Sequence, residues 1–139
     1  MEHRYIKVGS VTLPNEPLSN FQFINAAKRL KIPHFRGVFL RNELPNNPKE
    51  NECGVLNLDT DTGTHWVAWY KSSHQALYFD SYGIQPPTEI INYLNQDIYY
   101  PTEQVQRGNQ VVCGHLCLYV LLELGKQTRS LQEIINGLF

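Results

Sequence analysis

The sequence predicts an α+β fold in which a mainly antiparallel sheet is flanked by helices. Three strand patterns follow one another in the middle of the chain, separated only by short turns, and this arrangement is typical of an antiparallel meander. They lie at 54–58, 65–70 and 76–80. Helical patterns stand before them, at 21–30, and after them, at 113–124. We expect one domain over residues 1–139, because a chain of this length buries roughly two-thirds of its unfolded surface in one core.

The N-terminal third is predicted to hold one short strand and one helix. The strand pattern covers 7–13 in a turn-rich segment. The helix is expected over 21–30 because Ser19 or Asn20 can cap its first turn and Pro33 ends it.

Further elements are expected around and after the strands. A polar loop at 42–52 precedes them, and Pro86-Pro87-Thr88 opens a helix over 89–95. The pattern at 98–105 favours a strand near the sheet edge, because Pro101 interrupts it. Ser130-Leu-Gln-Glu is a capping box that begins a last short helix.

Composition favours a folded, intracellular protein. Hydrophobic residues make up 42% and charged residues 18% of the chain, and the net charge is −1, which gives no electrostatic case for binding nucleic acid or an anionic membrane. We expect no signal peptide and no membrane span, because the first residues lack an apolar run and no stretch approaches the roughly 20 apolar residues that cross a bilayer. Three cysteines, an odd number, indicate reduced thiols.

Cys113 stands at the start of the apolar helical pattern Cys-Gly-His-Leu-Cys-Leu-Tyr-Val-Leu-Leu. A thiol at this place faces the unpaired N–H groups and the positive dipole end of the helix, which favour the thiolate. Thiolate is the form that attacks carbonyl carbons. A lone cysteine before an apolar helix is nevertheless more often a core residue than a nucleophile.

His65 and Asp80 supply the two other residue types that a cysteine nucleophile uses, a base and a carboxylate that orients it. They are fifteen residues apart on neighbouring predicted strands, so a meander can bring them side by side. Taken singly, each has an ordinary interpretation as a strand-end histidine and a turn aspartate.

Gln106 is a candidate donor to the oxyanion that forms during acyl transfer. It lies seven residues before Cys113, and the intervening loop contains Gly108 and Asn109, so it can fold back. The backbone N–H of Cys113 would be the second donor. Gln104 and Gln110 compete for the role on residue type alone.

At these four positions the chain resembles the adenovirus endopeptidase (adenain) family and the related SUMO-specific, ubiquitin-like proteases. Their shared order is His-Trp, then Asp or Glu, then Gln, then Cys-Gly. Here the order reads Gly-Thr-His65-Trp66, Tyr-Phe-Asp80-Ser-Tyr-Gly, Gln106-Arg-Gly-Asn and Cys113-Gly-His-Leu-Cys. The Gln-to-Cys spacing and the Phe-Asp-x-aromatic-Gly block are closer to adenain.

The resemblance implies a cysteine endopeptidase with a compact papain-like architecture in permuted order. His65 would be the general base and then acid, Asp80 its orienting partner, Gln106 the oxyanion donor and Cys113 the nucleophile. Trp66 would line a narrow substrate cleft. Relatives of this kind cut after glycine, often at Gly-Gly or Gly-x-Gly, so a polypeptide with such a site is the expected substrate.

Two departures concern activators. Adenain is activated by a disulfide-linked peptide and by DNA, but this chain has no cysteine between Asp80 and Gln106 and no basic net charge. Dependence on a peptide or on DNA therefore stays open. The carboxylate is aspartate, as in the SUMO branch, where adenain has glutamate.

The resulting expectation is a monomeric thiol endopeptidase that matures structural precursors of a virus or virus-like element, located in the host cytoplasm, the nucleus or the virion. Deubiquitinating or deSUMOylating activity, an acyltransferase with the same triad and a degenerate binding module are the alternatives. No cofactor is expected. No metal is expected either, because Cys113, His115 and Cys117 at i, i+2 and i+4 of a helix do not converge.

Overall fold

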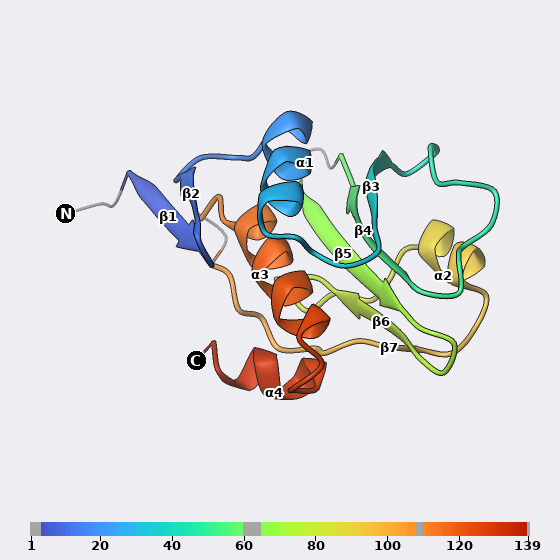
Figure 1. The fold of residues 1–139 in the computed structure, drawn as a ribbon. Helices are drawn as coiled ribbons and strands as arrows, with labels where there is room; N and C mark the ends of the chain where they lie inside the picture. The colour runs from blue at the N-terminus through green and yellow to red at the C-terminus, as the bar shows by residue number, and fades with distance from the viewer. Residues whose placement is uncertain (1–3, 60–64, 108–109, 139) are drawn as a thin grey trace.

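The computed structural model describes residues 4–59, 65–107 and 110–138. Within these ranges a hairpin of two strands stands beside a sheet with the order β3-β4-β5-β6-β7 (Figure 1). In chain order the elements are β1 (Tyr5–Val8), β2 (Val11–Pro14), α1 (Asn20–Arg29), β3 (Phe35–Leu40), β4 (Glu52–Asn57), β5 (Trp66–Lys71), β6 (Ala76–Phe79), α2 (Thr88–Leu94), β7 (Ile98–Tyr99), α3 (Cys113–Gly125) and α4 (Leu131–Asn136).

The sheet is antiparallel at its centre and parallel at both edges. The predicted meander is confirmed: β4 pairs antiparallel with β5, and β5 pairs antiparallel with β6. At the edges, β3 runs parallel to β4 and β7 runs parallel to β6. Parallel neighbours need a crossover rather than a tight turn. A long loop supplies the first crossover and α2 the second.

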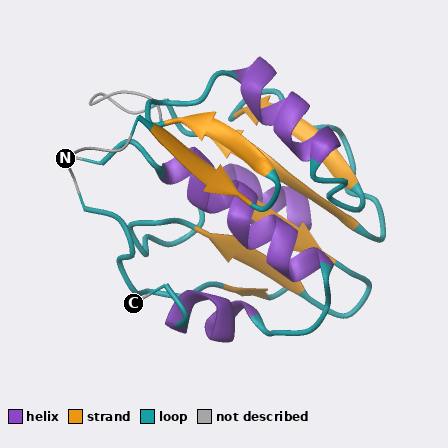
Figure 2. Ribbon diagram, turned by 60° about the vertical axis from the view of Figure 1, so that its left-hand side comes forward, coloured by secondary structure: helices purple, strands orange, loops and turns teal. Residues whose placement is uncertain are grey.

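Helices cover both faces of this sheet, which explains why its central strands are apolar throughout. Side chains alternate along β5, so that Trp66 and Ala68 pack with α1, α3 and α4, whereas Val67 and Trp69 pack with α2. Figure 2 shows α3 lying along the face of the sheet, with the β1–β2 hairpin packed outside it. The start of β5, the end of β6 and the first turn of α3 therefore meet at one end of the molecule.

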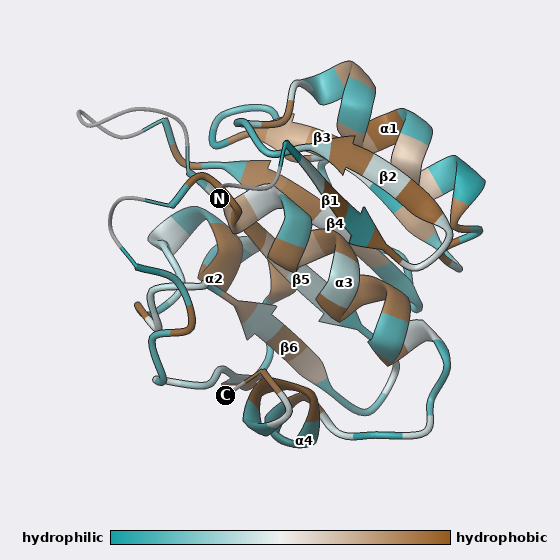
Figure 3. Ribbon diagram, turned by 90° about the vertical axis from the view of Figure 1, so that its left-hand side faces the viewer, coloured by the Kyte–Doolittle hydropathy of each residue, from teal (hydrophilic) through white to brown (hydrophobic). Residues whose placement is uncertain are grey.

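The helix α1 begins as the sequence predicts. Ser19 is its N-cap and forms a capping box with Gln22, in which the Ser19 hydroxyl accepts from the Gln22 N–H at 3.2 Å and the Gln22 side chain accepts from the Ser19 N–H at 2.8 Å. The helix buries Phe23, Ala26 and Ala27, whereas its outer face carries the exposed Phe21 and Ile24 among polar residues, and hydrophilic and hydrophobic colours alternate along it in Figure 3. In the described part of the chain no helix is both long and apolar enough to span a bilayer.

Two of the strand predictions are wrong in their limits. The pattern at 7–13 is a hairpin instead of one strand, because Gly9 takes a left-handed conformation (φ 56°) and turns the chain between β1 and β2. The pattern at 98–105 pairs only as far as Tyr99. Pro101 has no N–H to donate, and the chain beyond it leaves the sheet.

Candidate active site

Cys113 is the first residue of α3, and only 6% of it is exposed. The backbone N–H groups of Trp66 and Gly114 both donate hydrogen bonds to its sulfur. No side chain caps this helix start, whose N-cap is Val112. The positive end of the helix dipole is therefore directed at the sulfur, as expected from the sequence.

Gly114 allows the helices α1 and α3 to meet closely beside the cysteine. A Cβ at this position would lie 2.9 Å from the ring of Phe23 and 3.1 Å from Leu18. The start of α1 therefore packs directly against the first turn of α3. A side chain at this position would have to displace one of these two neighbours.

His65 and Asp80 form a buried pair. His65 precedes β5 and Asp80 follows β6, and because these strands are antiparallel, the start of one lies beside the end of the other. The distance from His65 Nε2 to Asp80 Oδ1 is 2.9 Å. The same carboxylate oxygen accepts the N–H of Tyr82 at 2.8 Å. His65 is 8% exposed and Asp80 3%.

The ring of His65 is held between partners on three sides. Its Nε2 contacts Asp80. The ring also forms a hydrogen bond with Cys113, and because Nε2 is already paired, Nδ1 is the nitrogen left for this bond. The ring of Tyr82 stacks on the imidazole with a centroid distance of 4.9 Å and an interplanar angle of 30°. The half-buried Tyr82 thus forms a wall of the site.

The electrostatic environment favours a charged pair of His65 and Cys113. Burial acts to lower the pKa of His65, but hydrogen bonds from Asp80 and Cys113, together with their charges, raise it to about 9. Burial acts to raise the pKa of Cys113, but the hydrogen bond with His65, the N–H groups of Trp66 and Gly114 and the charge of His65 lower it. The arrangement is chemically suited to a thiolate beside an imidazolium.

The other two cysteines have the opposite character. Burial and the nearby charge of Glu52 raise the pKa of Cys53 to about 12. Burial, Cys113 and Asp80 raise the pKa of Cys117, whose Sγ donates to the carbonyl of Trp66 at 3.4 Å. All three thiols are free, and Cys113 is the one whose surroundings favour ionisation.

Gln106 is the buried member of the three candidate glutamines. Only 3% of it is exposed, whereas Gln104 and Gln110 are exposed. Its Nε2 donates to the carbonyl of Gln110 at 2.7 Å, and its Oε1 accepts from the hydroxyl of Ser81 at 2.6 Å. Its amide is therefore held in place by Ser81, the residue that directly follows Asp80.

Trp66 is buried rather than exposed on a cleft wall. It is 2% exposed, its Nε1 donates to the carbonyl of Leu18 at 3.1 Å, and its ring lies 4.7 Å from that of Phe23. Part of Trp66 lines an open hollow of about 370 Å³. The other lining residues are Leu18, Ser19, Asn20, Phe21 and Asn57. Trp66 thus contributes to the floor of this hollow.

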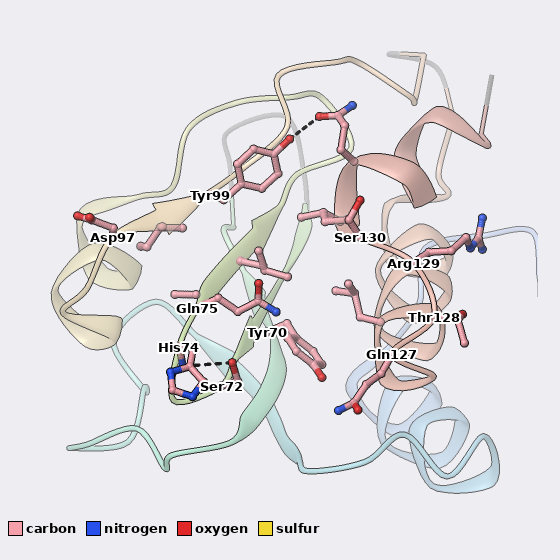
Figure 4. Close-up of a pocket in the computed structure, with 16 residues that line it drawn as sticks. Tyr70, Ser72, His74, Gln75, Asp97, Tyr99, Gln127, Thr128, Arg129 and Ser130 are labelled. Carbon is pink, nitrogen blue, oxygen red and sulfur yellow. Dashed lines mark hydrogen bonds between the residues drawn. The ribbon is translucent and has the colours of Figure 1, made fainter.

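A larger hollow of about 930 Å³ lies at the other end of the strands, by the β5–β6 turn (Figure 4). It lies between this turn, β7 and the connection from α3 to α4, and its lining includes Tyr70, Gln75, Tyr99 and Gln127. None of the candidate residues lines it. The larger hollow therefore lies away from His65 and Cys113, whose pKa values are shifted. These shifted pKa values identify the candidate site better than the volume of a hollow does.

His115 joins the β1–β2 hairpin to α3 and does not face Cys113 as a ligand partner. Its Nε2 donates to the carbonyl of Pro14 at 2.7 Å, and because a carbonyl oxygen can only accept, Nε2 is the protonated nitrogen. Among the residues that the structure describes, no three His, Cys, Asp or Glu side chains are grouped so as to hold a metal ion.

Ser81 and Tyr82 are the contacts that sequence reasoning did not assign. Both belong to the Asp80-Ser-Tyr-Gly block, which was the available signal. Strand alternation predicts that neighbours of Asp80 point elsewhere, but it does not identify their partners.

No family model matches the sequence, and no curated protein matches it. Among solved structures, the chain is similar to the ASFV pS273R protease, with a TM-score of 0.63 and 19% sequence identity. The match covers 87% of this chain and 62% of that one, so this chain spans less than two-thirds of the length of the ASFV protease. The likeness does not point to the adenovirus branch in particular. It confirms the papain-like α+β fold that the sequence predicts.

Proposed function

We propose that this chain is a cysteine endopeptidase, acting as a single-domain monomer, in which Cys113 is the nucleophile. The observation that carries the proposal is the position of His65, which contacts Asp80 on one side and Cys113 on the other. The pKa values of His65 and Cys113 move in opposite directions, as a thiolate–imidazolium pair requires.

In the proposed reaction, Cys113 Sγ attacks the carbonyl carbon of the scissile peptide bond. The tetrahedral intermediate that forms would place its oxyanion near the Gln106 amide and the Cys113 backbone N–H. As the C–N bond breaks, His65 gives its proton to the leaving amine. Water then attacks the thioester with His65 as the base, which releases the carboxylic acid and restores the Cys113 thiolate beside the His65 imidazolium. Asp80 keeps the ring oriented throughout.

We propose glycine-containing sites as the substrate, of the Gly-Gly or Gly-x-Gly type. Support comes from the resemblance at His65-Trp66 and Cys113-Gly114, and from the hollow beside Trp66, which the start of α1 borders. Its rim includes Phe21, which is 85% exposed. Structural precursors of a virus or virus-like element are the proposed targets, in keeping with the likeness in fold to the ASFV protease.

Selective alkylation tests the nucleophile. The protein is treated with iodoacetamide at pH 6, and the labelled cysteine is identified by intact mass and peptide mapping. We expect fast modification at one site, lost in Cys113→Ala and slowed at least tenfold in His65→Ala, since the thiolate is the reacting form. Cys53→Ala is the matched control and should label at the wild-type rate. Equal reactivity of Cys113 and Cys53 would contradict the proposal.

Substrate class is tested with two probes, a ubiquitin-like Gly-Gly vinyl sulfone and a set of peptides with Gly-x-Gly sites. Peptide cleavage that disappears in Cys113→Ala, without capture by the vinyl sulfone, supports a precursor protease. Capture by the vinyl sulfone would shift the assignment to deubiquitinating or deSUMOylating activity. Fast alkylation with acyl transfer to added amines in place of hydrolysis would identify an acyltransferase.

A further inference from the structure

Ser81 occupies a buried position between the two halves of the candidate site. It follows Asp80 directly and is 0% exposed. Its hydroxyl donates to Gln106 Oε1 at 2.6 Å. Its carbonyl oxygen accepts two backbone N–H groups from the same segment, that of Val105 at 2.8 Å and that of Gln106 at 3.1 Å. Three hydrogen bonds therefore join this one residue to the Gln106 segment.

The turn after Ser81 makes this approach possible. The N–H of Gly83 donates to the carbonyl of Asp80 at 2.8 Å, and Gly83 has a left-handed conformation with φ of 72°. A Cβ at Gly83 would lie 2.3 Å from the carbonyl oxygen of Thr102. The chain from Thr102 to Gln106 can therefore lie directly against the Asp80–Gly83 turn only because residue 83 is glycine.

The Gln106 amide has a defined orientation in this setting. The carbonyl of Gln110 can only accept, so the group facing it at 2.7 Å is the NH₂ of Gln106. The oxygen of the amide consequently faces Ser81, and the hydroxyl must donate to it. The NH₂ group has two N–H bonds, and the second has no partner among the residues that the structure describes.

We propose that Ser81 is a positioning residue that fixes the Gln106 amide so that this second N–H is presented to the oxyanion. The inference rests on the proposed function. Without the Ser81 hydroxyl, the amide keeps only its bond to Gln110 and can rotate about that bond, so its free N–H loses its fixed direction. In the intact protein, the two adjacent residues Asp80 and Ser81 would thus have parallel roles: Asp80 orients His65, and Ser81 orients Gln106.

The test separates acyl transfer from simple thiolate reactivity. Two rates are measured for each variant: the p-nitrophenol burst with N-acetylglycylglycine p-nitrophenyl ester, which passes through an oxyanion, and alkylation by iodoacetamide, which does not. We expect Ser81→Ala to slow the burst roughly tenfold and Gln106→Ala about 100-fold, with KM for the ester nearly constant. Alkylation of Cys113 should stay at the wild-type rate in both.

A double variant and a matched control complete the design. Ser81→Ala/Gln106→Ala should be as slow as Gln106→Ala alone, because Ser81 acts only through the amide. Ser72→Ala, in the β5–β6 turn, should leave both rates unchanged. Ser81→Cys keeps a donor in nearly the same volume, so it should react faster than Ser81→Ala and serves if the alanine variant does not fold.

Three results would overturn the positioning role of Ser81. One is a burst rate unchanged in both Ser81 variants, the second is equal slowing of burst and alkylation, and the third is additive slowing in the double variant. Failure of the proposed function has a different signature, because wild-type protein would then show neither a burst nor fast alkylation of Cys113.

Discussion

At the scale of single residues, the proposed mechanism predicts that Asp80 sets the upper pH limit of activity. The pKa of His65 is raised to about 9, against the effect of burial, by its hydrogen bonds and by the charges of Asp80 and Cys113. In Asp80→Asn the strongest of these partners loses its charge, so the pKa of His65 falls. The imidazolium that we propose to protonate the leaving amine would then be lost at lower pH.

We therefore expect the alkaline limb of kcat/KM for a Gly-Gly amide substrate to lie near pH 9 in the wild type. In Asp80→Asn it should move down by roughly one pH unit or more, since an opposite charge in contact shifts a pKa by about one to three units. The measurement is the pH profile of hydrolysis from pH 5 to 10. Asp97→Asn is the control and should keep the wild-type limb, because Asp97 is exposed and lines the hollow at the other end of the strands. An unmoved limb in Asp80→Asn would show that the carboxylate does not set the pKa of His65.

The sequence predicts residue types and order at the site better than it predicts contacts. The pairing of His65 with Asp80 follows from the meander, because antiparallel strands bring positions fifteen apart together. The contact of Ser81 with Gln106 spans 25 residues and depends on a turn and a loop without periodic pattern. The burial of Trp66 depends on the packing of Phe23 from α1, which no spacing within β5 reveals.

At the scale of elements, local signals predict helix starts well and strand ends poorly. The capping box predicted at Ser130 forms, and of the two cap candidates for α1 it is Ser19 that caps the helix; each cap is complete within four residues. The extent of β7 depends instead on its pairing with β6, which stops at Leu77 and Tyr99 before β6 ends, and on the missing N–H of Pro101. Parallel pairing at the sheet edges likewise depends on crossovers, whose direction the patterns of the single strands do not contain.

The contact between α1 and α3 gives a prediction for Gly114. An alanine there is the better helix former by about 1 kcal/mol, but its Cβ would stand 2.9 Å from the rigid ring of Phe23. Overpacking of this kind costs roughly 1–3 kcal/mol, so Gly114→Ala should lower the free energy of unfolding. It should also slow alkylation of Cys113, because the shift of the helix start that relieves the clash would move the N–H of residue 114 away from that sulfur.

Urea unfolding of four proteins checks this prediction: wild type, Gly114→Ala, Phe23→Leu and the double variant. The smaller leucine makes room for the new methyl group, so Gly114→Ala should be neutral or stabilising in the Phe23→Leu background. Equal destabilisation by Gly114→Ala in both backgrounds would show that the ring of Phe23 is not the obstacle.

At the scale of the whole molecule, one buried carboxylate ties together the elements on the sheet face opposite α3. Glu52 is 2% exposed at the start of β4. Its Oε1 accepts from Arg36 Nη1 at 2.8 Å and from the Lys49 N–H at 2.6 Å, and its Oε2 accepts from Trp69 Nε1 at 2.9 Å and from the Tyr93 hydroxyl at 2.7 Å. The two parallel-paired strands β3 and β4, the centre strand β5 and the helix α2 are thereby joined at one point.

Glu52→Gln tests this junction, because all four neighbours are donors and an amide NH₂ would face at least two of them. Arg36 would also lose its charged partner, which destabilises the fold further. We expect the free energy of unfolding at pH 7 to fall by roughly 3–5 kcal/mol. Glu16→Gln, on the surface, is the matched control and should change it little.

The difference between wild type and Glu52→Gln should also depend on pH in a defined direction. Burial acts to raise the pKa of Glu52, but the hydrogen bonds from Lys49, Tyr93, Trp69 and Arg36 lower it below 4.5. A carboxylate with a lowered pKa contributes stability that is fully present above its unfolded pKa and is lost as the pH falls through its folded pKa. Urea unfolding at pH 7, 5 and 3 should therefore give a constant gap between pH 7 and 5 that narrows at pH 3. A gap that stays constant down to pH 3, while the wild type remains folded, would mean that the stabilisation comes from the shape of the side chain and not from its charge.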